Sequence, residues 1–369
     1  MESRHEKSRS LPGYGLLACL AVVVTATIVA VTVSASTAAP RKAAAVPKGF
    51  NRVGNILLTD QFNNRVLELN PKTKRIVWRF GTGSFVAGKK TVVAPNDAER
   101  IPGGRTLIAG TGAPAGTAGY PPAGAQDNRV FIVNAQKKIV WQYGKAGVAG
   151  SGPNQLNAPV AAIYLPNGHI VITDQGNQRV IEVNKAKKIV WQYGTTGVSG
   201  AGANQLNNPN SAEVLANHRI LIADESNNRV IEVTKKTKKV VWQYGSPTNT
   251  AALNGAAFAS RLPSGRTLIT DVSNNRVIEV SKAKKIVFEY PTNKQPGSIA
   301  APNPTRAVRL SNGVILIANQ FDHQVLTVNR AKSVVWKYGK IGVAGKAHGF
   351  LNAPYSAYRI GDYTGMTRP

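Results

Sequence analysis

The stretch GSGPNQLNAPVAAIYLPNGHIVITDQGNQRVIEVNKAKKIVWQYG, residues 150–194, decides the fold. It consists of short runs of β-branched and aromatic residues separated by Asn, Asp, Gly and Lys, and its apolar residues show no helical spacing. Runs of this length between such turn residues are typical of β-strands. We therefore expect four strands in this stretch, near residues 158–165, 169–173, 179–183 and 188–193.

The same pattern occurs six times, about every 50 residues. The copies of its last three runs begin at Gly54, Gly104, Gly168, His218, Gly265 and Gly313. The weaker first run occurs at residues 94–101, 158–165, 208–215, 255–262, 302–309 and 353–360. One four-stranded unit cannot bury both faces of its sheet alone, so six consecutive units predict an all-β, six-bladed β-propeller of four-stranded antiparallel blades.

The two ends of the repeat array are offset by one strand. The chain enters the array on a second strand, at Gly54, and leaves it on a first strand, at residues 353–360. We expect the N- and C-terminal strands to share one blade, because that pairing leaves no open sheet edge. The predicted organisation is therefore a linker at 41–50, the propeller at 51–361 and a C-terminal tail at 362–369.

The order of residues within the repeat resembles that of NHL-repeat proteins. Residues 150–183 contain the Gly-rich segment, Gln-Leu-Asn, Pro, Asn-Gly, Asp and Asn-x-Arg-Val in that family's order, and the resemblance covers nearly all of residues 50–360. The Trp-Gln-Tyr-Gly endings are also similar to quinoprotein-type and arylsulfotransferase-type propeller repeats. These families share an architecture and no single chemistry, so the resemblance implies the fold alone.

The N-terminus predicts export. Basic residues precede an uncharged, apolar or small-residue stretch at Leu16–Val33, so residues 1–40 are interpreted as a signal peptide or a signal anchor. The basic flank places the rest of the chain outside the cytoplasm, secreted or anchored by this segment. Cys19 is the only cysteine, which leaves the predicted propeller without a disulfide or a thiolate metal site.

The net charge of +28 predicts attraction to anionic partners. Seventeen basic residues, here called the turn cations, lie between the expected third and fourth strands of the six repeats, at Lys72, Lys74, Arg75, Lys137, Lys138, Lys185, Lys187, Lys188, Lys235, Lys236, Lys238, Lys239, Lys282, Lys284, Lys285, Arg330 and Lys332. Propeller symmetry puts these turns on one face. This ring is interpreted either as a solvated surface or as a binding surface for an anionic envelope polymer, a phospholipid surface or a protein partner. Export argues against nucleic acid, and we expect a monomer.

Two sets of repeated residues are interpreted as structural. Asp60, Asp174 and their equivalents end the second strand, close before the repeated Arg, and are expected to tie the following turn by hydrogen bonds. The repeated Trp of the fourth strand is expected to pack one blade against the next. An active site is normally unique, whereas these residues are copied around the ring.

A ligand site is predicted at the channel mouth opposite the turn cations. The expected first strands carry Asn96, Asp97, Asn210 and Ser211 near that mouth, and the long insertion at residues 110–126 carries Tyr120. The carboxylate and amide oxygens suit calcium, and the ring and hydroxyl of Tyr120 suit a small ligand. The insertion is equally well explained as a tolerated surface loop.

Catalysis is the second hypothesis. Propeller lyases and lactonases need converging His, Glu, Asp or Asn ligands for a metal, and arylsulfotransferases need a histidine nucleophile, yet the expected first strands contain no histidine. We therefore favour a non-catalytic binding or scaffold module of the cell envelope, with no cofactor assigned. The alternative is a channel-centred lactonase, lyase or arylsulfotransferase-like enzyme.

Overall fold

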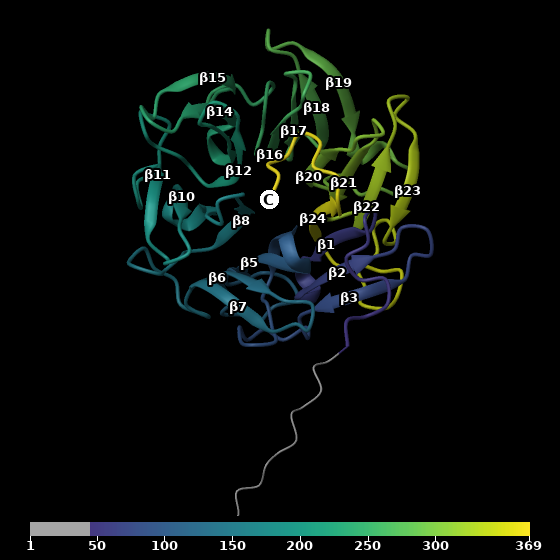
Figure 1. The fold of residues 1–369 in the computed structure, drawn as a ribbon. Helices are drawn as coiled ribbons and strands as arrows, with labels where there is room; N and C mark the ends of the chain where they lie inside the picture. The colour runs from purple at the N-terminus through teal and green to yellow at the C-terminus, as the bar shows by residue number, and fades with distance from the viewer. Residues whose placement is uncertain (1–44) are drawn as a thin grey trace, which may run out of the picture. The chain divides into compact units, whose positions relative to one another are not determined.

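Six four-stranded antiparallel sheets surround a central axis in the computed structural model, which describes residues 45–369 (Figure 1). We number the sheets as blades I to VI along the chain. The described residues contain five 3₁₀ turns and no α-helix: η1 (Gln61–Asn63), η2 (Pro102–Gly104), η3 (Gln175–Asn177), η4 (Glu225–Asn227) and η5 (Thr292–Lys294). This arrangement confirms the predicted six-bladed propeller.

The strands of each blade are given from the channel outward. Blades I and II contain β24 (Pro354–Arg359), β1 (Ile56–Asp60), β2 (Arg65–Leu69) and β3 (Ile76–Phe80), then β4 (Pro95–Ile101), β5 (Arg105–Ala113), β6 (Ala125–Val133) and β7 (Ile139–Gly144). Blades III and IV contain β8 (Pro159–Tyr164), β9 (Ile170–Asp174), β10 (Arg179–Val183) and β11 (Ile189–Tyr193), then β12 (Pro209–Leu215), β13 (Arg219–Asp224), β14 (Arg229–Thr234) and β15 (Val240–Gly245). Blades V and VI contain β16 (Ala256–Arg261), β17 (Thr267–Asp271), β18 (Arg276–Val280) and β19 (Ile286–Pro291), then β20 (Pro304–Arg309), β21 (Ile315–Asn319), β22 (Gln324–Val328) and β23 (Val334–Tyr338).

The ring closes in blade I, where the C-terminal β24 pairs with β1. Gly54 N–H donates to the Ile360 carbonyl at 2.9 Å, and Ile360 N–H donates to the Asn55 carbonyl at 2.8 Å. Blade III has the same pair of bonds within a continuous turn, where Gly168 donates to Leu165. Two distant chain segments therefore rebuild the turn that the other blades make covalently, as the offset of the chain ends predicts.

The hydrophobic core lies between neighbouring blades. The middle strands β1 and β2 are buried along their whole length because both of their faces contact apolar side chains. Leu57 and Val66 of blade I, for example, pack with Ile108 and Phe131 of blade II. Strands buried on both faces need apolar residues at consecutive positions, which explains the runs ILL and RVIEV in the repeat.

The repeated Asp and Arg are structural, as predicted. In blade III the Asp174 carboxylate accepts hydrogen bonds from Asn177 Nδ2 and Arg179 Nε, both at 2.8 Å, and from Asn157 N–H at 2.8 Å. The carboxylate thus joins the turn after β9 to the connection that enters the blade. Blades I, IV and V have the same Asp–Arg pair at 2.6 to 2.7 Å.

The antiparallel strand order gives the disc two different faces. Turns after the first and third strands of every blade lie on one face, called the lysine face because it carries the turn cations. Turns after the second strands and the connections between blades lie on the other, called the loop face. No described residues form a helix that is long and apolar enough to span a membrane, and the predicted signal segment lies outside the described residues.

Candidate functional site

Three charged or polar side chains from three blades meet in the channel. Arg306 of β20 places Nη2 2.9 Å from Asp97 Oδ1 of β4, and the Tyr358 hydroxyl of β24 donates to the same oxygen at 2.9 Å. The guanidinium also lies over the Tyr358 ring, 4.9 Å from its centroid. All three side chains are at least nine-tenths buried. The Asp97 charge is therefore matched inside the protein, as a buried ion pair requires.

Two further carboxyl groups lie nearer the lysine face. Burial raises the pKa of Glu99 well above its usual value. Burial also raises the pKa of Glu213 to about 7, although Thr367 opposes this shift by donating from its backbone N–H and its hydroxyl to Glu213 Oε2, at 2.9 and 2.8 Å. The protonation of Glu213 therefore changes near neutral pH.

The C-terminal tail, residues 361–369, crosses the lysine-face mouth of the channel, and the chain ends near the centre of the ring (Figure 1). The Tyr363 hydroxyl donates to the Arg100 carbonyl at 3.4 Å, and Met366 packs against the core that joins blades V, VI and I. Thr367 hydrogen-bonds to the backbone of Val214 on β12. The tail therefore contacts first strands from opposite parts of the ring.

At the loop-face mouth the side chains form a hydrogen-bonded web. Gln61 Nε2 donates to Asn96 Oδ1 at 2.7 Å, and Gln320 Nε2 donates to Gln61 Oε1 at 2.8 Å. Asn210 Nδ2 donates both to Glu225 Oε2, at 2.8 Å, and to the Tyr355 hydroxyl, at 2.7 Å. Gln61, Glu225 and Gln320 occupy one repeat position, directly after the second strand, and their partners Asn96, Asn210 and Tyr355 occupy another, on the first strand.

Four of the five predicted ligand residues lie in the channel wall, and the fifth, Tyr120, lies over blades I and II. Asn96 and Asp97 of β4, and Asn210 and Ser211 of β12, all lie in the channel wall. Their polar groups bond to neighbouring blades: Asp97 Oδ2 accepts from Ala162 N–H at 3.1 Å, and Ser211 Oγ accepts from Ala259 N–H at 3.3 Å. No group of three or more His, Cys, Asp or Glu residues suited to a metal occurs among residues 45–369.

Tyr120 lies over blades I and II. Its hydroxyl donates to Asn64 Oδ1 at 2.7 Å, and its ring contacts the rings of Phe62 and Phe85. Burial raises the pKa of this phenol. Tyr120 reaches the channel mouth through Gln61, whose carbonyl accepts a second bond from the hydroxyl at 3.2 Å and whose side chain bonds to Asn96.

Sequence reasoning missed Gln61, Gln320, Glu225, Arg306 and Tyr358. The first three share one repeat position, directly after the second strand, where the polar side chain differs between blades. The signal for Arg306 and Tyr358 was weaker: Arg306 stands where three other blades carry Ala or Ser, and Tyr358 stands where the other blades carry Glu, Ile, Ser or Val. Such exceptions identify channel residues once the strand register is known.

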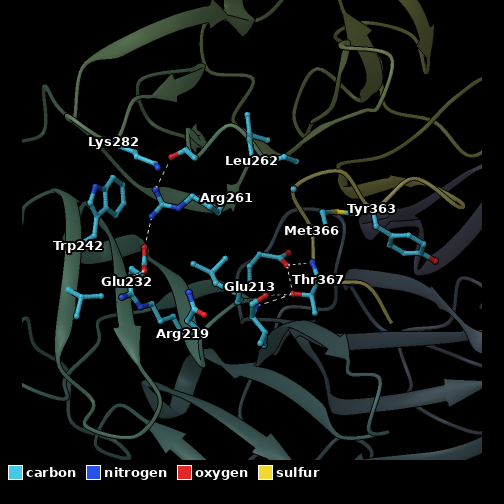
Figure 2. A pocket seen from close by; sticks show the side chains of 18 residues that line it. Glu213, Arg219, Glu232, Trp242, Arg261, Leu262, Lys282, Tyr363, Met366 and Thr367 are labelled. Atoms are coloured by element: carbon cyan, nitrogen blue, oxygen red, sulfur yellow. Dashed lines mark hydrogen bonds and ion pairs between the residues drawn. The ribbon is translucent and has the colours of Figure 1, made fainter.

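A pocket of about 950 Å³ lies on the lysine face between blades IV and V (Figure 2). Glu232 on its wall pairs with Arg219 and Arg261, both at 2.7 Å. Arg261 lies over the Trp242 ring, 4.5 Å from its centroid, and Thr367 of the tail forms part of the opposite wall. One carboxylate is therefore shared by two guanidinium groups here.

The Trp side chains join adjacent blades, as predicted. The Nε1 groups of Trp78, Trp191 and Trp336 donate to the carbonyls of Ala135, Lys235 and Pro71, at 3.2, 2.8 and 2.8 Å. Each acceptor belongs to the turn between the third and fourth strands of the next blade. These bonds hold neighbouring turns of the lysine face side by side.

The turn cations are the largest charged feature of the lysine face. Lys235 is half-buried and pairs with Glu182, Arg330 pairs with Glu279, and the other fifteen are exposed and form no ion pair with a described carboxylate. Lys187, Lys238 and Lys284 have left-handed backbone conformations at equivalent turn positions. The ring is thus a regular array of unpaired positive charge.

The chain belongs to the family of outer membrane protein assembly factor BamB, whose model matches residues 30–338. This match covers most of the propeller and fixes the family as a β-propeller family. Comparison with curated proteins gave no match.

One solved structure supports the fold. A protein of unknown function from Bacteroides caccae is 16% identical, with a TM-score of 0.55, and the alignment covers 78% of this chain and 93% of that one. A virginiamycin B lyase from Staphylococcus aureus is 13% identical, with a TM-score of 0.47 and coverage of 81% and 88%. At these identities the likeness concerns the fold alone.

Proposed function

We propose that this chain is a non-catalytic binding or scaffold propeller of the cell envelope that contacts an anionic partner through its lysine face. The observation that carries the proposal is the set of fifteen exposed turn cations that have no carboxylate partner among residues 45–369. Unpaired like charges repel one another, so an array of them is stabilised when an anionic surface or polymer neutralises it. We infer a phospholipid or anionic polymer surface as the partner.

A binding role also agrees with the state of the channel. The Asp97 carboxylate pairs with Arg306 and accepts a hydrogen bond from Tyr358. At the lysine-face mouth the C-terminal tail forms a hydrogen bond to Glu213. A catalytic site needs groups that are free to contact a substrate. The channel-centred enzyme therefore remains the less favoured hypothesis.

An envelope location is part of the proposal. It is supported by the predicted signal segment and by the family's description as an outer membrane assembly factor. We further interpret the repeats as NHL-like, from their Gln-Leu-Asn and Asn-x-Arg-Val motifs.

The test compares two triple variants that lose the same charge from opposite faces. Lys236, Lys238 and Lys239 are exposed turn cations, whereas Lys89, Lys90 and Lys145 are exposed on the loop face. We leave Lys235 intact because it pairs with Glu182. Replacing the first three by Gln is expected to weaken binding to anionic lipid vesicles and to reduce its salt dependence, because fewer counterions are released.

The loop-face variant should bind as the native protein does. Cosedimentation with phosphatidylglycerol vesicles at several salt concentrations measures both effects. Equal loss in the two variants would mean that net charge alone acts, and equal retention would contradict a role for the ring.

A further inference from the structure

A Glu–Arg ion pair joins neighbouring blades at three of the six interfaces, and a Glu–Lys pair, Glu182 with Lys235, joins blades III and IV. A Glu near the end of the third strand pairs with an Arg on the first strand of the next blade: Glu68 with Arg100 at 2.6 Å, Glu232 with Arg261 at 2.7 Å, and Glu279 with Arg309. Each Arg lies over the aromatic ring of the preceding fourth strand, at Trp78, Trp242 and Phe288. The repeat thus builds a carboxylate–guanidinium pair against an aromatic wall.

The interface where the ring closes keeps the Arg and the Trp and lacks the Glu. Arg359 of β24 is the equivalent Arg, and Thr327 of β22 stands where blades I, III, IV and V have Glu, opposite Trp336 in the sheet register. The side chain of Arg359 forms no hydrogen bond or ion pair with the residues that the structure describes, and its Nε is buried. Arg100 and Arg309 also have unbonded Nε atoms, but their Nη2 groups hold a carboxylate.

A pocket of about 640 Å³ lies at this place. Its lining contains the cations Arg359, Arg52 and Lys72 and no Asp or Glu, in contrast to the pocket between blades IV and V, which contains Glu232. Its apolar lining is Trp336 together with Val53, Val314 and Val335, and polar residues, among them Asn55, Asn70 and Asn312, complete the walls. Positive groups next to an apolar wall suit an anion with a hydrocarbon part.

We propose that this pocket binds a small organic acid, whose carboxylate pairs with Arg359 in the place that Glu occupies at the other interfaces. A guanidinium forms short, charge-assisted hydrogen bonds with a carboxylate, and a partly buried one without a partner gains most from them. The hydrocarbon part lies against Trp336 and the valines. This site does not depend on the proposed function, because it requires one enclosed carboxylate and not an extended anionic surface.

The indole N–H of Trp336 is a local reporter, because the protein has five Trp residues and therefore at most five indole signals in a ¹⁵N–¹H spectrum. Hexanoate is the probe, added to the full chain at low ionic strength. We expect it to shift the Trp336 signal, assigned with Trp336→Phe, and to leave Trp242 in place. Hexan-1-ol has no charge and should cause no shift. Inorganic phosphate has no hydrocarbon part, and an equal response to it would overturn the assignment to organic acids.

Thr327→Glu is the decisive variant, because it supplies the carboxylate that blades I, III, IV and V have at this position. It should weaken hexanoate binding at least about tenfold, while the protein stays folded. Thr327→Val keeps the size of Thr327 without adding a charge, so it should bind as the native chain does. Hexanoate binding that survives Thr327→Glu, or no response of Trp336 in the native chain, would overturn the proposal. Replacing Lys236, Lys238 and Lys239 by Gln should leave this response of Trp336 unchanged. Either proposal can therefore be contradicted while the other stands.

A variant of another interface tests whether the absence of the Glu creates the binding site. Glu232→Thr removes the carboxylate from Arg261 and Arg219 and makes the pocket between blades IV and V resemble the closing one. Hexanoate should then shift the Trp242 indole as well. A Trp242 signal that stays unmoved in this variant would contradict the idea that a missing Glu creates the site.

Discussion

Thr367, two residues from the C-terminus, donates its hydroxyl proton to the buried carboxylate of Glu213 at 2.8 Å. The backbone N–H of Thr367 donates to the same oxygen at 2.9 Å. The last residues of the chain are thus held by a group whose pKa burial raises to about 7. Attachment of the tail is therefore linked to the protonation of one side chain.

The first prediction concerns pH. The pKa of Glu213 rises from 4.5 to about 7 on folding, so the folded state binds the proton more tightly than the unfolded state does. Its contribution is therefore fully present below pH 4.5 and is lost as the pH rises through 7, by about 3 kcal/mol. Glu213→Gln removes this titration. The free energy of unfolding, measured by urea between pH 4.5 and 8, should fall less with rising pH in the variant than in the native chain.

The second prediction separates closure of the ring from the tail. Deleting residues 350–369 removes β24 with the buried Ala357, Tyr358 and Ile360, and should lower the free energy of unfolding by more than about 5 kcal/mol. Deleting residues 363–369 leaves β24 paired, so the ring should stay closed with a much smaller loss. Thermal unfolding of the two truncated chains gives the comparison. Similar losses in both would mean that β24 contributes little to closure.

The sequence predicted this closure because the repeat has a fixed strand order. Six copies with matching register define the number of blades, and the offset between Gly54 and residues 353–360 defines the shared blade. The Asp–Arg turn was predictable for the same reason. Because the repeat occurs six times, the residue type that each position requires can be compared in six copies.

Residues that depart from the repeat were harder to predict. Blade II has Gly110 where most blades have the turn Asp, and the role passes to Asp127 on the next strand, whose carboxylate pairs with Arg129 at 2.5 Å. A Cβ on Gly110 would lie 2.5 Å from that carboxylate carbon, so the Gly and the displaced Asp require each other. The cluster of Asp97, Arg306 and Tyr358 depends on three blades meeting at the channel, which no local pattern encodes.

The third prediction concerns that cluster. Asp97→Ala leaves the Arg306 guanidinium buried without its carboxylate and should cost about 3–5 kcal/mol of stability. Adding Arg306→Met removes the unpaired charge and should recover part of this loss. Urea unfolding of the native chain, both single variants and the double variant gives the coupling energy. A double variant as unstable as the sum of the two single variants would contradict a direct Asp97–Arg306 pair. Because Asp97→Ala is expected to be destabilising, it is a poor test of ligand binding on its own.

The last prediction compares two Trp residues in equivalent strands. Trp191 donates its indole N–H to the Lys235 carbonyl at 2.8 Å, whereas the buried Nε1 of Trp242 has no acceptor among residues 45–369. Replacing either by Phe removes a similar volume of ring. Trp191→Phe also leaves a carbonyl without its donor, while Trp242→Phe removes an unbonded polar group, so Trp191→Phe should be the more destabilising by about 1 kcal/mol. Trp242 stacks with Arg261 and Trp191 with Lys235, and Phe keeps an aromatic face toward each cation. Denaturant unfolding of both variants at one pH measures the difference. A larger loss in Trp242→Phe would mean that its indole N–H is bonded in solution, for example to a group bound in the pocket between blades IV and V.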